Sequence, residues 1–393
     1  MKAEDINDQE TLKVWLQNRP HEDAVWIAHR AAMRVLPVWA SSIDNSRRHE
    51  SDLIGVALLR ALLTSGVGSK FPIAEGMTAA ALAYADAGST ILSIALATNA
   101  ARADPAIAAR AAATKAALAD APIAAALAAS SSSARAADFA RVAASAAVSW
   151  KQISNDCEAL QRSEVLDEVP LRVDAPNPFQ SQWDRSCATW QANPDYAFWL
   201  RWYEAALAGN PPNWPLLHDI ALIPNADWAK GITHIAGLIA IFEERYHLLR
   251  QIADLQEQLR DVTTLSTANA ASPEHRSHNN PPDLINAPVE IRRAFTVITV
   301  ALDDAKAELE TPVPRPSVLR RAGHALLDAV KSILGYCAAL GDIALKEGAK
   351  VVGLTGTKWA IGILAVSVST QLPPLQSLAR ALLDFAQKLP TLH

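Results

Sequence analysis

The hydrophobic positions of this chain repeat mostly at intervals of three and four residues, which is the spacing of amphipathic α-helices. The longest example covers residues 228–262, where Arg245 interrupts an otherwise regular series of large apolar side chains. The apolar positions of this series are Leu238, Ile241, Leu248, Ile252, Leu255, Leu259 and Val262. The pattern predicts one long amphipathic helix with a seam similar to that of a coiled coil.

The first 162 residues are also predicted to be helical. The apolar spacing and the positions of proline and glycine indicate helices over residues 20–35 and 53–63. Residues 78–150 are rich in alanine, the residue with the highest helix propensity. We interpret this stretch as four stacked helices. Low-complexity disorder is the alternative, because few large apolar residues lie between positions 104 and 133.

A dense group of aromatic residues overlaps the end of an irregular, proline-rich connector at residues 163–194 and continues beyond it. Its members are Trp183, Trp190, Tyr196, Phe198, Trp199, Trp202, Tyr203, Trp214 and Trp228. Phe198, Trp202 and Ala206 share one face of a predicted helix, and Gly209 is expected to end that helix.

Two interpretations of this aromatic group are open. Trp199, Trp202 and Tyr203 could form a stacking platform for a sugar, a base or a peptide. Alternatively, they form the core of the middle domain, which is the more usual role of aromatic residues at helical spacing. On the second interpretation, Trp199 and Trp202 are mostly buried.

The patterns together predict an all-α protein with four parts. An Ala-rich helical region covers residues 1–162, and a Trp-rich domain that ends in the long helix covers residues 163–262. Residues 263–288 are polar and proline-bearing, which predicts a flexible linker. Residues 289–393 form a separate helical region, which includes an apolar run at residues 359–368 that is too short for a single membrane span.

The distribution of charge adds to this picture. The chain has a net charge of −5, so it lacks the basic surplus of a nucleic-acid-binding protein. Residues 317–393 nevertheless carry a net charge of +4, with eight Lys or Arg and four Asp or Glu. The three cysteines lie far apart and the N-terminus has no secretory pattern, so we expect a reducing, cytoplasmic location, with peripheral membrane attachment as an option.

Familiar catalytic and metal-binding motifs give weak matches. The strings at residues 66–70 and 353–358 resemble phosphate-binding loops, but the lysine follows the Ser or Thr instead of preceding it, so we interpret both as turns. Glu244 and His247 have metal-ligand spacing, yet a di-iron site needs a second copy of that motif. His275 and His278 lie in the predicted linker without a neighbouring cysteine. The sequence therefore predicts no catalytic residue, metal site or cofactor.

The aromatic region also resembles a group of uncharacterised bacterial proteins. The resemblance is carried by FWLRWYEAALAGNPPNWPLLHDIALIPNADWAKGITHIAGLIAIFEERY and by a later HNNPPDLI segment, and it covers about residues 140–290. Members share the W-x-x-W-Y helix, an aliphatic-Pro-x-x-x-W turn and the HNNPP segment. The resemblance implies a bacterial, intracellular protein and assigns no activity.

We therefore expect a non-catalytic interaction protein that associates with a protein partner or with itself, and whose C-terminal region docks on a partner or on an anionic membrane. The candidate interaction surface consists of Leu248, Ile252, Leu255, Leu259, Arg320, Arg321, Lys331, Lys346 and Trp359. One alternative is a two-part effector with a membrane-perturbing tail. Another is an enzyme whose site is assembled from scattered residues. A pocket that contained His218, Asp219, His234 or Glu244 would favour the enzyme.

Overall fold

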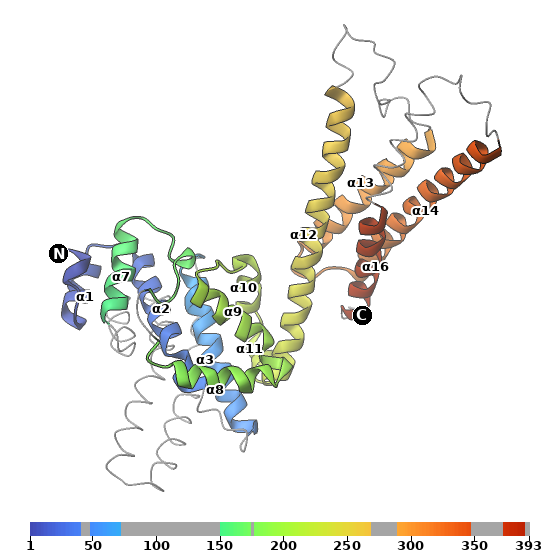
Figure 1. Ribbon diagram of the computed structural model, residues 1–393. Coiled ribbons are helices and arrows are strands. Elements are labelled where there is room, and N and C mark those ends of the chain that lie inside the picture. Colours follow the sequence, from blue (N-terminus) through green and yellow to red (C-terminus); the bar gives the residue numbers. More distant parts are fainter. Residues whose placement is uncertain (41–47, 72–149, 174–176, 269–288, 347–371, 390–393) are drawn as a thin grey trace. The chain divides into compact units, whose positions relative to one another are not determined.

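The computed structural model describes residues 1–40, 48–71, 150–173, 177–268, 289–346 and 372–389 (Figure 1). Over these ranges the protein is all-α, as predicted, with α-helices, three short 3-10 helices and no strand. The chain forms two compact units, Met1–Ala240 (unit 1) and Ile241–His393 (unit 2). The boundary differs from the expected domains, because the described parts of residues 1–162 and the aromatic region belong to one unit. The Ala-rich stretch at residues 78–150 lies almost wholly outside the described residues.

The helices of unit 1 come from both halves of its sequence. They are α1 (Gln9–Leu16), α2 (His21–Ala40), α3 (Arg48–Gly68), α7 (Trp150–Gln161), α8 (Gln180–Gln191), α9 (Ala197–Ala208), α10 (Trp214–Ala221) and α11 (Asn225–Trp228). The 3-10 helices are η1 (Ala3–Asp5), η3 (Leu166–Glu168) and η4 (Pro194–Tyr196). Helix α12 (Ile232–Ala268) begins in unit 1 and ends in unit 2. It continues six residues into the segment that we expected to be a linker, and the rest of that segment is not described.

Helix α2 is the central helix of unit 1. Every residue from Asp23 to Pro37 is buried, and α2 packs against α3, α7 and α8. A helix that is enclosed on all sides must be apolar on all sides or must find partners for its polar groups. Most of the buried positions are Ala, Val, Ile, Leu or Met, but Arg30 and Arg34 are also enclosed.

Arg30 and Arg34 share one carboxylate. Asp156 of α7 accepts a bond from Nε of Arg30 (2.9 Å) and bonds from both terminal nitrogens of Arg34 (2.6 and 2.8 Å). The side chains of the two arginines and of Asp156 are at most 5% exposed. Burial of a charged group without partners is strongly unfavourable, so this geometry fixes α2 against α7.

Four further guanidinium N–H groups bind backbone carbonyls of residues 166–171, the part of the connector that follows α7. Arg30 donates to the carbonyls of Leu166 (2.7 Å), Val169 (2.9 Å) and Pro170 (2.7 Å). Arg34 donates to the carbonyl of Leu171 (2.9 Å). Residues 166–171 contain no α-helix, so these bonds satisfy backbone carbonyls of an irregular segment; the carbonyl of Leu166 also accepts a bond from the backbone N–H of Val169 (3.4 Å).

The aromatic residues form much of the remaining core of unit 1. Trp199 is fully buried and Trp202 is 7% exposed, which confirms that both are core residues. Gly209 ends α9, as predicted, with a left-handed φ of +73°. A Cβ atom at this position would lie 2.6 Å from the backbone nitrogen of Pro170, so only glycine allows the connector to pass this close.

Unit 2 is built from the second part of α12 together with α13 (Val289–Leu309), α14 (Pro316–Lys346) and α16 (Leu372–Lys388). Apolar residues from all four helices form one core. Arg245, which interrupts the apolar series of α12, is buried and donates through Nε to the carbonyl of Leu309 (2.5 Å) at the end of α13. Arg245 therefore interrupts the apolar series because its side chain binds a backbone carbonyl at the C-terminal end of α13.

The placement of the α12 seam corrects part of the expected interaction surface. Leu248, Ile252 and Leu255 are at most 4% exposed and belong to the unit 2 core, and Leu259 packs against that core. Helices of the same chain cover these side chains. An amphipathic seam indicates that a helix has an apolar partner, and in this protein the partner is intramolecular.

We predict that Arg34→Met destabilises unit 1 by about 3–5 kcal/mol, because Asp156 then loses two of its three charge-assisted bonds while it remains buried. Urea unfolding followed by circular dichroism measures the change. The control is Arg162→Met, which removes an exposed ion pair with Glu164 and should have little effect on stability, because water screens exposed charges. Equal effects of the two variants would contradict a structural role for the buried cluster.

Candidate functional site

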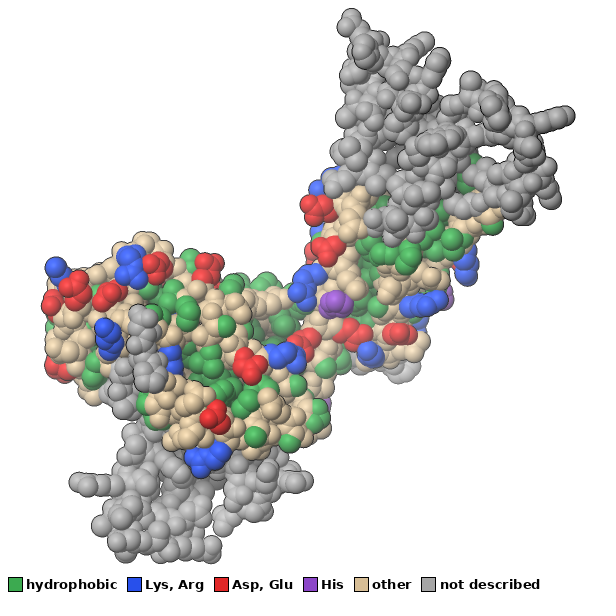
Figure 2. Space-filling view, viewed as in Figure 1, with side chains coloured by type: hydrophobic (Ala, Val, Ile, Leu, Met, Phe, Trp, Pro, Cys, Tyr) green, Lys and Arg blue, Asp and Glu red, His purple; other side chains and the backbone are tan. Residues whose placement is uncertain are grey.

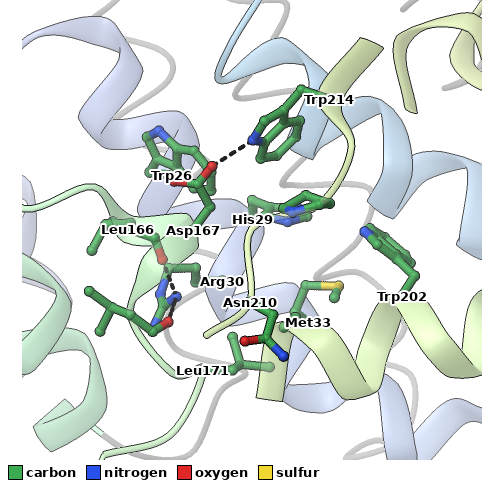
Figure 3. A pocket seen from close by; sticks show the side chains of 13 residues that line it. Trp26, His29, Arg30, Met33, Leu166, Asp167, Leu171, Trp202, Asn210 and Trp214 are labelled. Carbon is green, nitrogen blue, oxygen red and sulfur yellow. Dashed lines mark hydrogen bonds between the residues drawn. The ribbon is translucent and has the colours of Figure 1, made fainter. Parts of the chain in front are cut away.

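A small pocket lies beside α2 in unit 1 (Figure 3). Its cavity volume is about 40 Å³, which is space for about one water molecule. The lining residues are Trp26, His29, Arg30, Met33, Leu166, Asp167, Val169, Leu171, Trp202, Ala206, Asn210, Pro212 and Trp214. They come from α2, from the connector, from α9 and from the loop and first residue of α10. The pocket thus depends on the same connector that the two buried arginines hold in place.

Two indole rings form a corner at one side of this pocket. The rings of Trp26 and Trp214 are 5.7 Å apart and are inclined at 85°. The ammonium group of Lys70 lies over both rings, 5.5 Å from the centre of Trp26 and 5.6 Å from that of Trp214. The negative faces of aromatic rings attract cations at such distances, and tryptophan gives the strongest attraction.

A carboxylate completes this corner. Oδ2 of Asp167 accepts a bond from Nε1 of Trp214 (2.5 Å), as Figure 3 shows, and lies 3.3 Å from Nζ of Lys70. The side chain of Asp167 is 6% exposed, and its other oxygen is buried without a hydrogen-bond partner among the described residues. A buried carboxylate oxygen without a donor is unfavourable. The site therefore has an unused capacity to accept a hydrogen bond or to face a positive charge.

His29 lies between Trp26 and Trp202 in the same pocket (Figure 3). Burial lowers its pKa to about 3, with a further contribution from the charge of Arg30. The hydroxyl proton of Ser65 goes to the carbonyl of Leu62 (2.7 Å), so His29 must be the donor in its 2.8 Å bond to Ser65, through Nδ1. The imidazole thus contributes a flat neutral surface at physiological pH.

Local hydrogen bonds fix the backbone positions of Trp214 and Lys70, which lie at the two ends of the corner. Asn213 caps α10 by accepting a bond from the backbone N–H of Leu216 (3.2 Å), which fixes Trp214 as the first helical residue. The backbone N–H of Lys70 donates to the carbonyl of Val67 (3.0 Å) in the turn that follows α3. Lys70 is therefore fixed through its backbone, while its side chain is 30% exposed.

The turn after α3 accounts for the position of Lys70 in the string at residues 66–70, which resembles a phosphate-binding loop. A phosphate-binding loop precedes a helix, whereas this string spans the end of α3, so the interpretation as a turn is consistent with the structure. Gly66 has a separate packing role, because a Cβ atom there would lie 2.9 Å from Cε1 of His29. The similar string at residues 353–358 lies outside the described residues.

The expected basic interaction residues lie in unit 2. Arg320, Arg321 and Lys331 are exposed on α14. Arg321 pairs with Asp304 (3.6 Å) and Lys331 pairs with Asp328 (3.4 Å). The side chain of Lys346 and the whole of Trp359 are outside the description, as are His275 and His278. None of the seven proposed residues whose side chains the structure describes lines the pocket of unit 1.

The residues considered for an enzyme are dispersed. The ring of His218 packs against Phe71 at 4.9 Å, and Nε2 of His234 lies 2.9 Å from Asp227. Glu244, in unit 2, binds Lys388 (2.7 Å). Neither these residues nor Asp219 line the pocket of unit 1. Within the described ranges, no group of three or more His, Cys, Asp or Glu side chains is arranged to hold a metal ion.

Apart from Trp202, which was considered as part of a stacking platform, the residues that line the pocket were not identified as a site from the sequence, and neither was Lys70 beside it. Trp26, Lys70, Asp167 and Trp214 are far apart in the chain, and each belongs to a different local pattern. Comparison of the chain with protein-family models, with curated proteins and with solved structures finds no match in any of the three. The resemblance of the aromatic region to a bacterial group therefore stays an expectation.

We predict that Trp202→Ala lowers the stability of unit 1 by about 3–5 kcal/mol, because the large side chain is enclosed in the core and leaves a cavity. Val165→Ala is the control, since Val165 is 46% exposed and its truncation should have little effect. Thermal unfolding followed by circular dichroism measures both. An unchanged melting temperature for Trp202→Ala would show that this ring is a binding surface rather than a core residue.

Proposed function

We propose that this chain is a non-catalytic helical interaction protein, and that unit 1 recognises an organic ammonium group at the corner formed by Trp26, Trp214 and Asp167. The observation that carries the proposal is the position of the Lys70 ammonium group, which already contacts both indole rings and the carboxylate. The protein's own lysine thus identifies the chemistry that this corner accepts. The recognised group would belong to a small molecule or to a side chain of a partner protein.

The protonation states in the pocket support binding rather than catalysis. A general base is effective when its pKa lies near the working pH, and the pKa of His29 is about 3. Arg30 is held by Asp156 and by three carbonyls, so its charge serves the framework. Asp167 is held on one oxygen by Trp214. Each polar group is therefore positioned to orient a ligand or to hold the fold.

The direct test is a titration of the full chain with tetramethylammonium chloride, observed through the NMR signal of the Trp214 indole N–H. The signal is assigned by its absence in Trp214→Phe. We expect a saturable shift in the wild type and at least about tenfold weaker binding in Asp167→Asn, because the carboxylate supplies the charge at the corner.

Two controls make this result specific. Asp184→Asn removes an exposed carboxylate on α8 and should leave the titration unchanged. Sodium chloride at the same concentrations should not reproduce the shift. If the Trp214 signal moves equally with both salts, or if Asp167→Asn behaves as the wild type, this corner is not an ammonium site and the proposal is wrong.

A second candidate function concerns unit 2 and is docking on an anionic membrane surface. It is favoured by the exposure of Arg320, Arg321 and Lys331 on α14, because exposed basic residues are attracted to acidic lipid headgroups. None of the described helices is long and apolar enough to cross a bilayer. On the face of unit 2 that Figure 2 shows, acidic and basic side chains are interspersed, so docking would depend on particular residues.

Liposome co-sedimentation tests this second function. We expect the chain to bind vesicles that contain phosphatidylserine and to dissociate as salt rises, because salt screens the attraction. Arg320→Glu/Arg321→Glu should abolish sedimentation. Lys151→Glu/Arg185→Glu, an equal charge change at exposed positions of unit 1, should not. Protein that stays in the supernatant with every lipid composition would exclude membrane docking.

A further inference from the structure

We infer that Lys70 is a tethered competitor for the corner of Trp26, Trp214 and Asp167, and that the ligand which displaces it is a methylated, quaternary ammonium group. This inference rests on the proposed function and makes it more specific. It assigns Lys70 as the occupant of the free protein and distinguishes the ligand from a primary amine.

The geometry allows Lys70 to leave without disturbing the fold. Its backbone is held by the turn after α3, in which the N–H groups of Lys70 and Phe71 both donate to the carbonyl of Val67 (3.0 and 2.9 Å). Its side chain is 30% exposed and has a 3.3 Å ion pair with Asp167, which is its one ion pair within the described part of the chain. The side chain can therefore rotate into solvent while the turn stays in place.

The chemistry of the corner favours a methylated ammonium over that of lysine. A lysine ammonium group is compact and strongly hydrated, so it loses favourable hydration when it lies against two indole rings. A quaternary ammonium group has no N–H, and its methyl groups can contact the ring faces while its charge interacts with them. The Trp214 N–H already binds Asp167 Oδ2, which keeps the carboxylate beside the rings after Lys70 has left.

Competition from Lys70 weakens the apparent affinity of the corner for its ligand. When a binding-competent state is only partly populated, the apparent dissociation constant rises by the reciprocal of that population. If Lys70 occupies the corner about 90% of the time, its removal strengthens binding about tenfold. A substitution that removes only the charge tests this while it retains the aliphatic side chain.

The experiment compares the full-length wild type with Lys70→Met and Lys70→Arg in the same NMR titration with tetramethylammonium. We expect Lys70→Met to bind about tenfold more tightly than the wild type. Lys70→Arg retains a cation and should remain near the wild-type affinity. Methylammonium should bind each protein more weakly than tetramethylammonium. Melting temperatures verify that both variants fold, which is expected because Lys70 is partly exposed at the end of α3.

The outcomes separate this inference from the proposed function. Equal affinities of Lys70→Met and the wild type would show that Lys70 does not compete, although the corner still binds ammonium ions. Tighter binding of methylammonium would overturn the assignment of a quaternary ligand. If no protein in the series binds either ion, while the Trp214 signal of each confirms a folded unit 1, then the ammonium site itself is wrong and the inference fails with it.

Discussion

The guanidinium groups of Arg30 and Arg34 are enclosed in unit 1, and a buried cation is tolerated only where charge and hydrogen bonds replace the water that it loses. Asp156 supplies the charge, and the carbonyls of the connector supply most of the remaining acceptors. This requirement brings α2, α7 and residues 166–171 together. It also determines where Asp167 lies, and therefore where the pocket forms.

Much of the fold follows from short-range patterns. The all-α class, the end of α9 at Gly209 and the burial of Trp199 and Trp202 depend on helical spacing and on one residue that permits a left-handed turn. A pattern within one helix determines which face is apolar, but it does not identify what covers that face. For this reason the seam of Leu248, Ile252 and Leu255 was interpreted as an intermolecular surface, whereas α13, α14 and α16 complete its core.

Helical spacing could not predict the candidate site, because its residues come from four segments that are far apart in the sequence. Its two principal rings, Trp26 and Trp214, are 188 positions apart in the sequence, and Asp167 belongs to an irregular connector. The burial of Arg30 and Arg34 could not be predicted from the sequence either, because Asp23, Arg30 and Arg34 lie on one helical face and resemble a polar stripe that points to solvent. Only the three-dimensional structure shows that α7 covers the two arginines and that Asp156 is their partner.

Arg30 and Arg34 bind residues 166–171 through backbone carbonyls and not through side chains. Four carbonyls between Leu166 and Leu171 accept these bonds, and every amino acid carries the same carbonyl group. The hold on this segment is therefore largely indifferent to side-chain identity at these positions. In evolutionary terms, the positions of this wall that are not packed in the core, unlike Leu166 and Leu171, can accumulate substitutions and acquire new ligand preferences, while selection on Arg30, Arg34 and Asp156 keeps the scaffold constant.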